Sequence, residues 1–235
     1  MSITSASLTK VLFEQKPSIT FIHVIPSQRM KRNTIFIILI VAIIGVTILN
    51  FLTIGESKEQ YVERIAQERI DRNGFMLSST SPLKDEEKRN FEGLNYFEVN
   101  PNFKITARIE LIKNRQPIFI PSTTDEQLKY IPFAKAFFEI NGEEQALLLY
   151  QDWEETDPNR LSLMFADETS DLETYGGGRY LDVMYRNTNS VIIDFNNAYN
   201  PYCHFNDEYS CPIPPRENYM NVAIRAGEKL YKTDY

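Results

Sequence analysis

The chain has 235 residues and a formal net charge of −7, with 25 basic and 32 acidic side chains. Residues 56–235 carry 20 of the basic and 31 of the acidic side chains, and such an acidic domain is a poor partner for nucleic acid or anionic lipid headgroups. A domain of about 180 residues is large enough to bury a core of its own.

The N-terminal residues 1–29 show scattered apolar side chains with no clear period. Met30 is followed by Lys31-Arg32-Asn33 and then by an apolar run, which is the form expected at the start of a signal anchor. We therefore predict that translation starts at Met30, or that residues 1–33 form a cytosolic tail.

The segment from Asn33 to Gly55 contains 23 residues without a charged side chain. A helix rises about 1.5 Å per residue, so about 20 apolar residues span the roughly 30 Å hydrocarbon core of a bilayer. The run is too long for a cleaved signal peptide, and it does not end in the small residues of a cleavage site. We predict a transmembrane signal anchor over residues 34–55, which makes the lipid bilayer a partner of the chain.

Charged residues flank this anchor asymmetrically. The side chains before it are basic and those after it are acidic: Arg29, Lys31 and Arg32, then Glu56, Glu59 and Glu63. Positive charge stays on the cytoplasmic side of a membrane span. We therefore expect a single-pass protein with a cytoplasmic N-terminus and an extracytoplasmic C-terminal domain.

A juxtamembrane helix is predicted within residues 56–80. Ser57-Lys-Glu-Gln60 has the form of a capping box, in which the serine and glutamine side chains each bond a backbone N–H. The helix ends at Asn73-Gly74, and Glu68 and Arg72 have the spacing of an ion pair on one helix face.

A second, short helix is predicted with Ser81 as its cap and Pro82 at its first helical position, and it ends at Gly93. From Phe103 onward the apolar residues alternate with a period of two, which is typical of strands. Eight strands are predicted, at 103–111, 117–121, 128–140, 145–152, 161–166, 179–185, 190–195 and 220–226.

The strongest hairpin signal is Asn141-Gly142, because both central residues of a two-residue hairpin turn adopt a positive φ. Short strands joined by turns indicate a mainly β fold, an antiparallel β-sandwich or barrel with two short N-terminal helices. This extracytoplasmic β domain is predicted to span residues 81–235.

The C-terminal third contains several long and unusual motifs. They are Phe165-Ala-Asp-Glu-Thr169, Glu173-Thr-Tyr-Gly-Gly-Gly-Arg-Tyr-Leu-Asp182, Asp194-Phe-Asn-Asn-Ala-Tyr-Asn-Pro-Tyr-Cys203 and Tyr209-Ser-Cys-Pro-Ile-Pro-Pro-Arg-Glu-Asn218. With these motifs, residues 60–228 closely resemble the family catalogued as domain of unknown function 1684. The resemblance implies no established activity and no catalytic residue. His204 departs from the small residue expected at its position.

A hairpin is predicted between the strands at 179–185 and 190–195. A three-residue loop would set Asp182 directly opposite Asp194. Two facing carboxylates repel each other unless an arginine, a shared proton or a bound cation compensates them. The pair is a candidate for acid–base catalysis, although an arginine salt bridge or a solvated rim is the simpler explanation.

Tyr175-Gly176-Gly177-Gly178-Arg179 offers consecutive backbone N–H groups that could wrap an anion, with Arg179 supplying positive charge. The alternative is a tight turn against which another segment packs closely. The predicted ligand-binding set combines this loop with nearby polar residues: Asp167, Tyr175, Gly176, Gly177, Gly178, Arg179, Asp182, Asp194, Asn196 and Asn200.

Cys203 and Cys211 are the chain's two cysteines. In an oxidising compartment, two cysteines in proline-rich irregular chain most simply form a disulfide. There are two alternatives. One is a metal site formed by the two cysteines with His204, and the other is a pair of buried, reduced thiols. Because the usual ligand spacing of a metal site is missing, neither a metal nor a cofactor is predicted. The loop 200–216 is either bracing for the sheet or the wall of a pocket.

The sequence therefore predicts a membrane-anchored, non-catalytic cell-envelope module that binds a small ligand or another envelope protein. Two alternatives stay open. One is a hydrolase in which Asp182 and Asp194 share a proton. The other is a structural assembly partner that uses an exposed strand edge or the juxtamembrane helix for its contacts.

Overall fold

The computed structural model describes residues 32–53 and 55–231, except for the side chains of Arg32 and of residues 50–53. The described residues belong to two compact units, divided after Gly55. The predicted tail lies outside the described residues up to residue 31, and so does the start predicted at Met30.

The first unit contains helix α1, Arg32–Thr53. Its large apolar side chains from Ile35 to Leu49 are exposed. Over the described residues, no helix combines the length and the hydropathy that a membrane span requires. Residue 54 of the predicted anchor lies outside the described residues. The transmembrane part of the predicted fold is therefore unconfirmed.

The second unit begins with helix α2, Lys58–Met76, and its start is the predicted capping box. The Gln60 N–H donates to the Ser57 hydroxyl at 3.2 Å, and the Ser57 N–H donates to Oε1 of Gln60 at 2.9 Å. The helix buries Tyr61 and Met76, and it ends beyond the predicted Asn73-Gly74 stop. Burial of Met76 explains this extension, because tertiary contacts outweigh the weak tendency of glycine to end a helix.

Helix α3, Asp85–Arg89, is shorter than the helix predicted from Ser81. Its N-cap is Lys84, and the segment 81–83 before it is buried rather than helical. Leu83 packs in a small apolar cluster with Met76 and Phe205, so burial decides the conformation of this turn.

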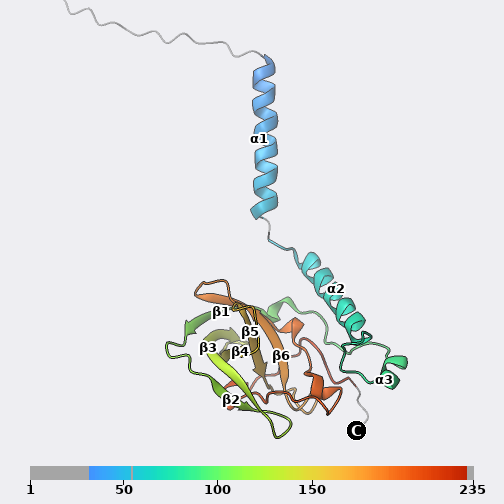
Figure 1. The fold of residues 1–235 in the computed structure, drawn as a ribbon. Coiled ribbons are helices and arrows are strands. Elements are labelled where there is room, and N and C mark those ends of the chain that lie inside the picture. The colour runs from blue at the N-terminus through green and yellow to red at the C-terminus, as the bar shows by residue number, and fades with distance from the viewer. Residues whose placement is uncertain (1–31, 54, 232–235) are drawn as a thin grey trace, which may run out of the picture. The chain divides into compact units, whose positions relative to one another are not determined.

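The remaining chain forms one antiparallel sheet that curls into a nearly closed barrel (Figure 1). Its strands follow the order β6-β5-β4-β3-β1-β7, β2 pairs with β3, and the two end strands β6 and β7 approach each other. The bounds are β1 Lys104–Leu111, β2 Ile118–Pro121, β3 Gln127–Ile140, β4 Glu143–Asp152, β5 Arg160–Phe165, β6 Arg179–Met184 and β7 Ser190–Asp194. Short 3₁₀ turns are η1 Pro101–Phe103, η2 Phe195–Asn197, η3 Tyr202–His204 and η4 Arg216–Asn218. The prediction of a mainly β, antiparallel fold is confirmed.

The hairpin between β3 and β4 forms where it was predicted. Asn141 and Gly142 have φ values of 54° and 82°, so both occupy the left-handed region that a two-residue turn of this kind requires. Ile140 pairs directly with Glu143 across the turn, and the two strands stay paired over most of their length.

The prediction of an eighth strand at residues 220–226 is wrong. Its alternate side chains are buried in the main core, namely Met220, Val222, Ile224 and Ala226. Its backbone, however, joins no strand ladder among the described residues. Alternation shows only that every second side chain is buried, and an irregular segment packed on the core satisfies that pattern as well as a strand does.

Candidate functional site

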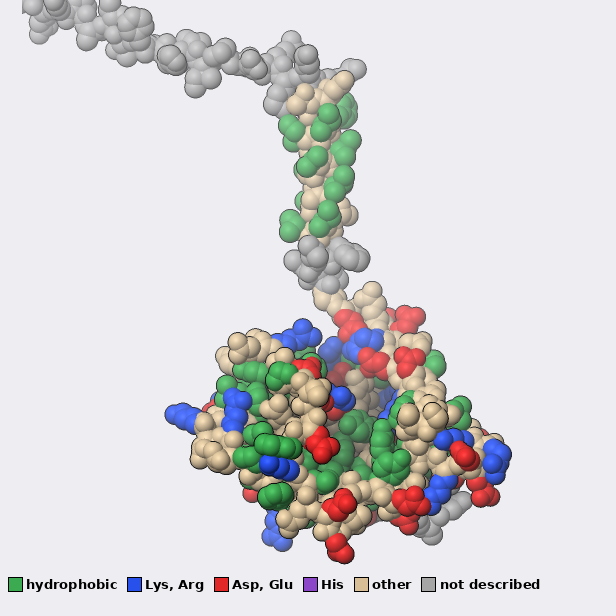
Figure 2. Space-filling view, viewed as in Figure 1, with side chains coloured by type: hydrophobic (Ala, Val, Ile, Leu, Met, Phe, Trp, Pro, Cys, Tyr) green, Lys and Arg blue, Asp and Glu red, His purple; other side chains and the backbone are tan. Residues whose placement is uncertain are grey.

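A cleft of about 550 Å³ lies between α2 and the barrel. Figure 2 shows this hollowed face, with apolar side chains inside and charged side chains of both signs around it. Six tyrosines are the most frequent lining residues: Tyr96, Tyr130, Tyr180, Tyr199, Tyr202 and Tyr209. Charged side chains of both signs also line it: Arg69, Arg72, Arg160, Glu68, Asp152, Glu155, Asp182 and Glu228.

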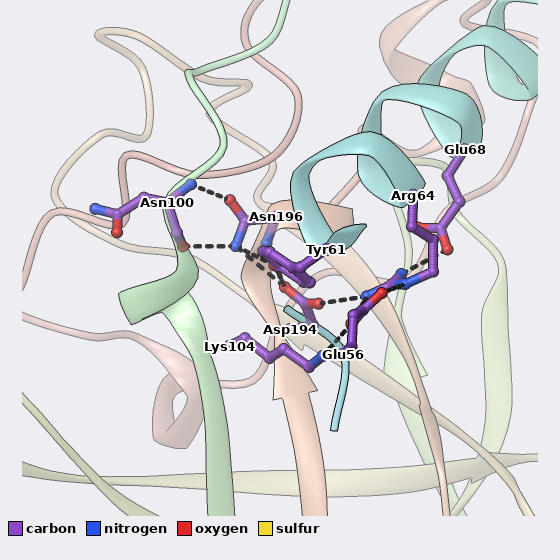
Figure 3. A network of polar contacts seen from close by, with 8 residues as sticks. All are labelled: Glu56, Tyr61, Arg64, Glu68, Asn100, Lys104, Asp194 and Asn196. Carbon is purple, nitrogen blue, oxygen red and sulfur yellow. Dashed lines mark hydrogen bonds and ion pairs between the residues drawn. The ribbon is translucent and has the colours of Figure 1, made fainter. Parts of the chain in front are cut away.

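A buried hydrogen-bond network holds the first turn of α2 on the barrel (Figure 3). The Tyr61 hydroxyl donates to Oδ1 of Asp194 at 2.8 Å. Nδ2 of Asn196 donates to the Tyr61 hydroxyl and to the carbonyl of Asn100, both at 2.8 Å. The backbone N–H of Asn100 donates to Oδ1 of Asn196 at 2.8 Å. The helix is therefore placed by groups far apart in the sequence.

An ion-pair network extends this contact at the surface (Figure 3). Glu56 accepts from Arg64 at 2.7 Å and from Lys104 at 3.0 Å, and these bonds lower the pKa of Glu56 to about 2. Arg64 also pairs with Glu68 at 2.7 Å. The predicted pair between Glu68 and Arg72 is therefore wrong, because each residue has a different partner.

Arg69 lies on the cleft side of α2. Its Nη1 donates to the carbonyl of Phe97 at 3.0 Å, and its guanidinium lies 4.5 Å from the centre of the Tyr96 ring. The Nε and Nη2 atoms are buried and have no hydrogen-bond partner, and the same is true of the Tyr96 hydroxyl. Burial lowers the pKa of Arg69 and raises the pKa of Tyr96.

Arg72 lies one helical turn further along α2. Its Nε bonds Oε1 of Glu228 at 3.1 Å, and its guanidinium lies 5.2 Å from the centre of the Tyr199 ring. Nη2 of Arg72 is buried without a partner. Glu228 is 1% exposed, and its second oxygen accepts the Asn200 N–H at 2.8 Å. Burial raises the pKa of Glu228, although Arg72 opposes that effect.

The opposite side of the cleft carries a separate charged group. Arg160 pairs with Asp182 at 2.7 Å and with Glu155 at 3.4 Å. The Tyr199 hydroxyl also donates to Asp182, at 3.4 Å. Both carboxylates therefore already have a cationic partner.

The predicted pairing of Asp182 with Asp194 is wrong. β6 pairs with β5, which sets Asp182 opposite Ser162, whereas β7 pairs with β1, which sets Asp194 opposite Lys104. Consecutive strands at the two ends of a nearly closed barrel need not pair with each other, because each finds its partner elsewhere in the sheet. The two carboxylates have separate partners, so the geometry offers no shared proton.

Three of the predicted ligand-binding residues are instead buried structural groups. Arg179, which is 1% exposed, donates to Asp167 at 2.8 Å and to the carbonyl of Ile224 at 2.8 Å. A further bond joins its Nη1 to the carbonyl of Ala226. Asn200 donates from Nδ2 to the carbonyl of Lys229. These groups hold the C-terminal segment on the barrel.

The glycine run is a tight turn rather than an anion cradle. Gly178 has a φ of +85°, and a Cβ at this position would lie 2.6 Å from both the Phe165 carbonyl oxygen and Cγ of Pro214. A Cβ at Gly176 or Gly177 would also meet side chains of the same turn. Close approach of neighbouring segments therefore accounts for the glycines.

The predicted disulfide is not formed, because both cysteines are free. The Cys203 N–H donates to Sγ of Cys211 at 3.2 Å. A hydrogen bond between the two thiols lowers the pKa of Cys203 to about 7 and, together with burial, raises the pKa of Cys211. Nε2 of His204 accepts the Tyr231 N–H at 3.1 Å, and burial lowers the pKa of His204 to about 4. Tyr175 packs on the His204 ring.

Of the predicted set, the structure brings only Asp182 and Asn196 to the cleft. Sequence reasoning did not place Arg69, Arg72 or Tyr96 at a candidate site, although all three line the cleft. Two arginines three positions apart on a predicted helix were a usable signal, since this spacing puts both side chains on one face. Tyr96 lies in irregular chain and offered no such signal.

The cleft offers charged and aromatic groups of the kind that orient a bound molecule. Cys211 is the lining thiol, and its pKa is raised.

Comparison with known proteins agrees with a fold whose activity is not assigned. A family model described as "Protein of unknown function (DUF1684)" matches residues 89–229. The chain also resembles an uncharacterized protein of Haloarcula marismortui whose structure was solved in solution by NMR, with a TM-score of 0.59 and 27% identity. That similarity covers 73% of this chain and 95% of the other. No curated protein matches the chain.

Proposed function

The chain belongs to the DUF1684 family of proteins of unknown function, and we propose that it is a non-catalytic binding module that takes a small ligand into the cleft beside α2. One observation carries this proposal. The cleft of about 550 Å³ is lined by six tyrosines and by charged side chains of both signs, which can enclose the body of a small molecule and orient its polar groups.

The volume of about 550 Å³ suits a small molecule, since small-molecule sites commonly enclose roughly 300–1,000 Å³.

A membrane anchor is a second part of the proposal. We infer it from the uncharged run between Asn33 and Gly55, together with the basic residues before it and the acidic residues after it. The anchor would hold the cleft on the extracytoplasmic side of a cell membrane. A full chain that is extracted from membranes by alkaline carbonate would contradict the anchor without affecting the cleft.

Native and denaturing mass spectrometry of the full chain, purified in mild detergent, tests the binding module. We expect extra mass in the native spectrum that is lost on denaturation. The variant Ser162→Trp fills the cleft from β5 and should lose this mass, whereas Thr106→Trp on the exposed face of β1 should keep it.

Two results together would contradict the ligand-binding proposal. The native mass would equal that of the chain alone, and no neutral or charged small molecule of a test panel would change the melting temperature. A protein captured from the membrane by a chain with an empty cleft would instead support the structural assembly alternative. The hydrolase alternative has no support from the separated carboxylates Asp182 and Asp194.

A further inference from the structure

The strand side of the cleft, meaning the lining that comes from β3 to β6 and their connections, carries an excess of negative charge. Its carboxylates belong to Asp152, Glu155 and Asp182, and its guanidinium belongs to Arg160. Arg160 pairs with Asp182 at 2.7 Å and with Glu155 at 3.4 Å, so two carboxylates share one positive charge. Three carboxylates against one guanidinium leave this side with a formal excess of two negative charges.

Asp152, the last residue of β4, forms no ion pair with any other described residue. It is half-buried, and its Oδ1 accepts the backbone N–H of Glu154 at 2.9 Å. A partly buried charge is screened by salt and water much less than one on the open surface. A cation that enters the cleft would therefore be attracted to Asp152.

The arginines of α2 do not cancel this excess. Arg69 and Arg72 share their side of the cleft with Glu68 and Glu228, so that side is formally neutral. Arg72 is paired with Glu228 at 3.1 Å. Nε and Nη2 of Arg69 are shielded from solvent, so these donors face the protein rather than the cleft. Over the whole lining, five carboxylates oppose three guanidinium groups.

The tyrosine rings of the cleft fall into two groups. The guanidinium of Arg69 lies 4.5 Å from the centre of the Tyr96 ring, and that of Arg72 lies 5.2 Å from the centre of the Tyr199 ring. The protein's own cations therefore already occupy these two rings. Within the described part of the chain, no lysine or arginine lies over the other tyrosine rings of the lining: Tyr130, Tyr180, Tyr202 and Tyr209. An aromatic face attracts a cation that lies within about 6 Å of its centre.

Two of these rings lie near Asp152 and are held in place. Tyr130 on β3 is directly opposite Asp152 in the strand pairing. The Tyr180 hydroxyl donates to the Pro212 carbonyl, which fixes the ring and leaves its face to the cleft. Between the strands that carry Asp152 and Tyr180 lies Ser162 on β5, whose small side chain leaves room for a ligand.

We infer that the cleft binds a small organic cation, an amine or a quaternary ammonium compound, with its positive charge beside Asp152 and its apolar groups against the rings of Tyr130 and Tyr180. This inference rests on the proposed function of the cleft and specifies the class of ligand. Aromatic faces and a volume of about 550 Å³ favour an organic cation over a metal ion, which would take oxygen ligands on several sides.

Titration calorimetry of the full chain in a non-ionic detergent, at neutral pH, tests the inference. The cationic probes are choline, benzylamine and phenethylamine, and their neutral analogues are dimethylbutanol, benzyl alcohol and phenethyl alcohol. At least one cation should bind at least about tenfold more tightly than its own analogue, because the analogue lacks the charge that Asp152 and the rings attract. Phenylacetate, an anion of similar size, should bind more weakly than phenethyl alcohol.

Three variants locate the effect. Asp152→Asn keeps the size of the side chain and should remove most of the preference for cation over analogue. Arg160→Gln frees Asp182 and Glu155 from their partner and should increase that preference. Asp125→Asn, in the exposed connection between β2 and β3, is the matched control and should bind like wild type. Melting temperatures of all three variants show whether the fold is intact.

The outcomes separate this inference from the proposed function. If no cation binds more tightly than its own analogue, or if phenylacetate binds as tightly as phenethylamine, the organic-cation assignment is wrong. An undiminished preference in a folded Asp152→Asn variant would also overturn it. If a neutral analogue binds and Ser162→Trp abolishes that binding, the cleft is still a ligand site, but one for neutral molecules. Failure of the proposed function itself requires a native mass equal to that of the chain alone and no response to any probe.

Discussion

The hydroxyl of Tyr61, on the first turn of α2, donates a 2.8 Å hydrogen bond to Asp194 at the end of β7. Tyr61 is 3% exposed, so the bond forms in a protected environment. The same helix presents Arg69 and Arg72 to the cleft two and three turns further on. The geometry of the cleft therefore depends on this contact between the first helix and the last strand of the domain.

Replacing Tyr61 by phenylalanine tests this contact. The ring remains, but Asp194 loses a donor and Nδ2 of Asn196 loses an acceptor. We expect a loss of about 2 kcal/mol in the free energy of unfolding, or roughly 4–8 °C in Tm, measured by thermal melting. Tyr185→Phe, which removes an exposed hydroxyl bonded to Asn187, is the control and should change Tm far less. Equal effects of the two substitutions would refute the proposed role of Tyr61.

The buried pair of Arg179 and Asp167 should contribute strongly to stability when one partner is removed. Both side chains are 1% exposed, and their oxygen and nitrogen lie 2.8 Å apart. Asp167→Asn leaves the guanidinium buried without its counter-charge, and we expect a loss of about 3–5 kcal/mol in urea unfolding. The exposed pair of Arg225 and Glu173 supplies the comparison, and Arg225→Gln should leave stability close to wild type. A mild effect of Asp167→Asn would mean that Arg179 is held by backbone carbonyls alone.

Gly178 and Gly74 should respond to alanine in opposite directions. Gly178 has a φ of +85°, and an added Cβ would lie 2.6 Å from the Phe165 carbonyl, so Gly178→Ala should destabilise the fold by more than about 1 kcal/mol. At Gly74, within α2, an added Cβ meets nothing within 4 Å. Gly74→Ala should therefore stabilise by roughly 0.5–1 kcal/mol. Urea unfolding measures the change in the free energy of unfolding for each variant. A change of the same sign at both positions would contradict the tight turn at Gly178.

His204 predicts a pH dependence of stability. Burial lowers its pKa to about 4, below the value of 6.5 expected for an unfolded chain. As pH falls below 6.5, the unfolded state takes up a proton that the folded state does not bind, so stability is lost on acidification between about pH 6.5 and pH 4. Between pH 7 and pH 5 the loss from this residue should be about 2 kcal/mol.

The measurement is the melting temperature at pH 7 and pH 5 for the wild type and for His204→Gln. The other titratable groups are common to both proteins, so the difference between the two pH dependences isolates the histidine. The variant should show the flatter pH dependence. An equal fall of Tm in both proteins would show that His204 is solvated enough to titrate normally.

Much of the local structure was predictable from the sequence. The capping box at Ser57 and the turn at Asn141-Gly142 formed as predicted, because each depends on residues only a few positions apart. Seven of the eight predicted strands formed, since alternating burial is a local pattern. The segment 220–226 shows the limit of that pattern, because alternate burial without a partner strand is not a strand.

The candidate site was much less predictable. The motifs around Arg179 and Asp194 are unusual, and they were interpreted as ligand-binding. In the structure they brace the barrel and hold α2, and their polar atoms are largely used within the protein. Part of each of the last three motifs also lines the cleft, including Tyr180, Tyr199 and Tyr209, but the motifs did not indicate which of their side chains would face it.

By itself, the sequence determined the family, the mainly β class, the positions of most strands and the helix that begins after Ser57, because these follow from motifs and from local periodicity. The tertiary structure alone decided that β6 and β7 do not pair, that Asp182 and Asp194 have separate partners, and that Arg69 and Arg72 share a cleft with Tyr96. These relationships depend on how the sheet closes and on where α2 lies against it. Closure and docking are set by the packing of side chains from distant parts of the chain, which no local pattern records.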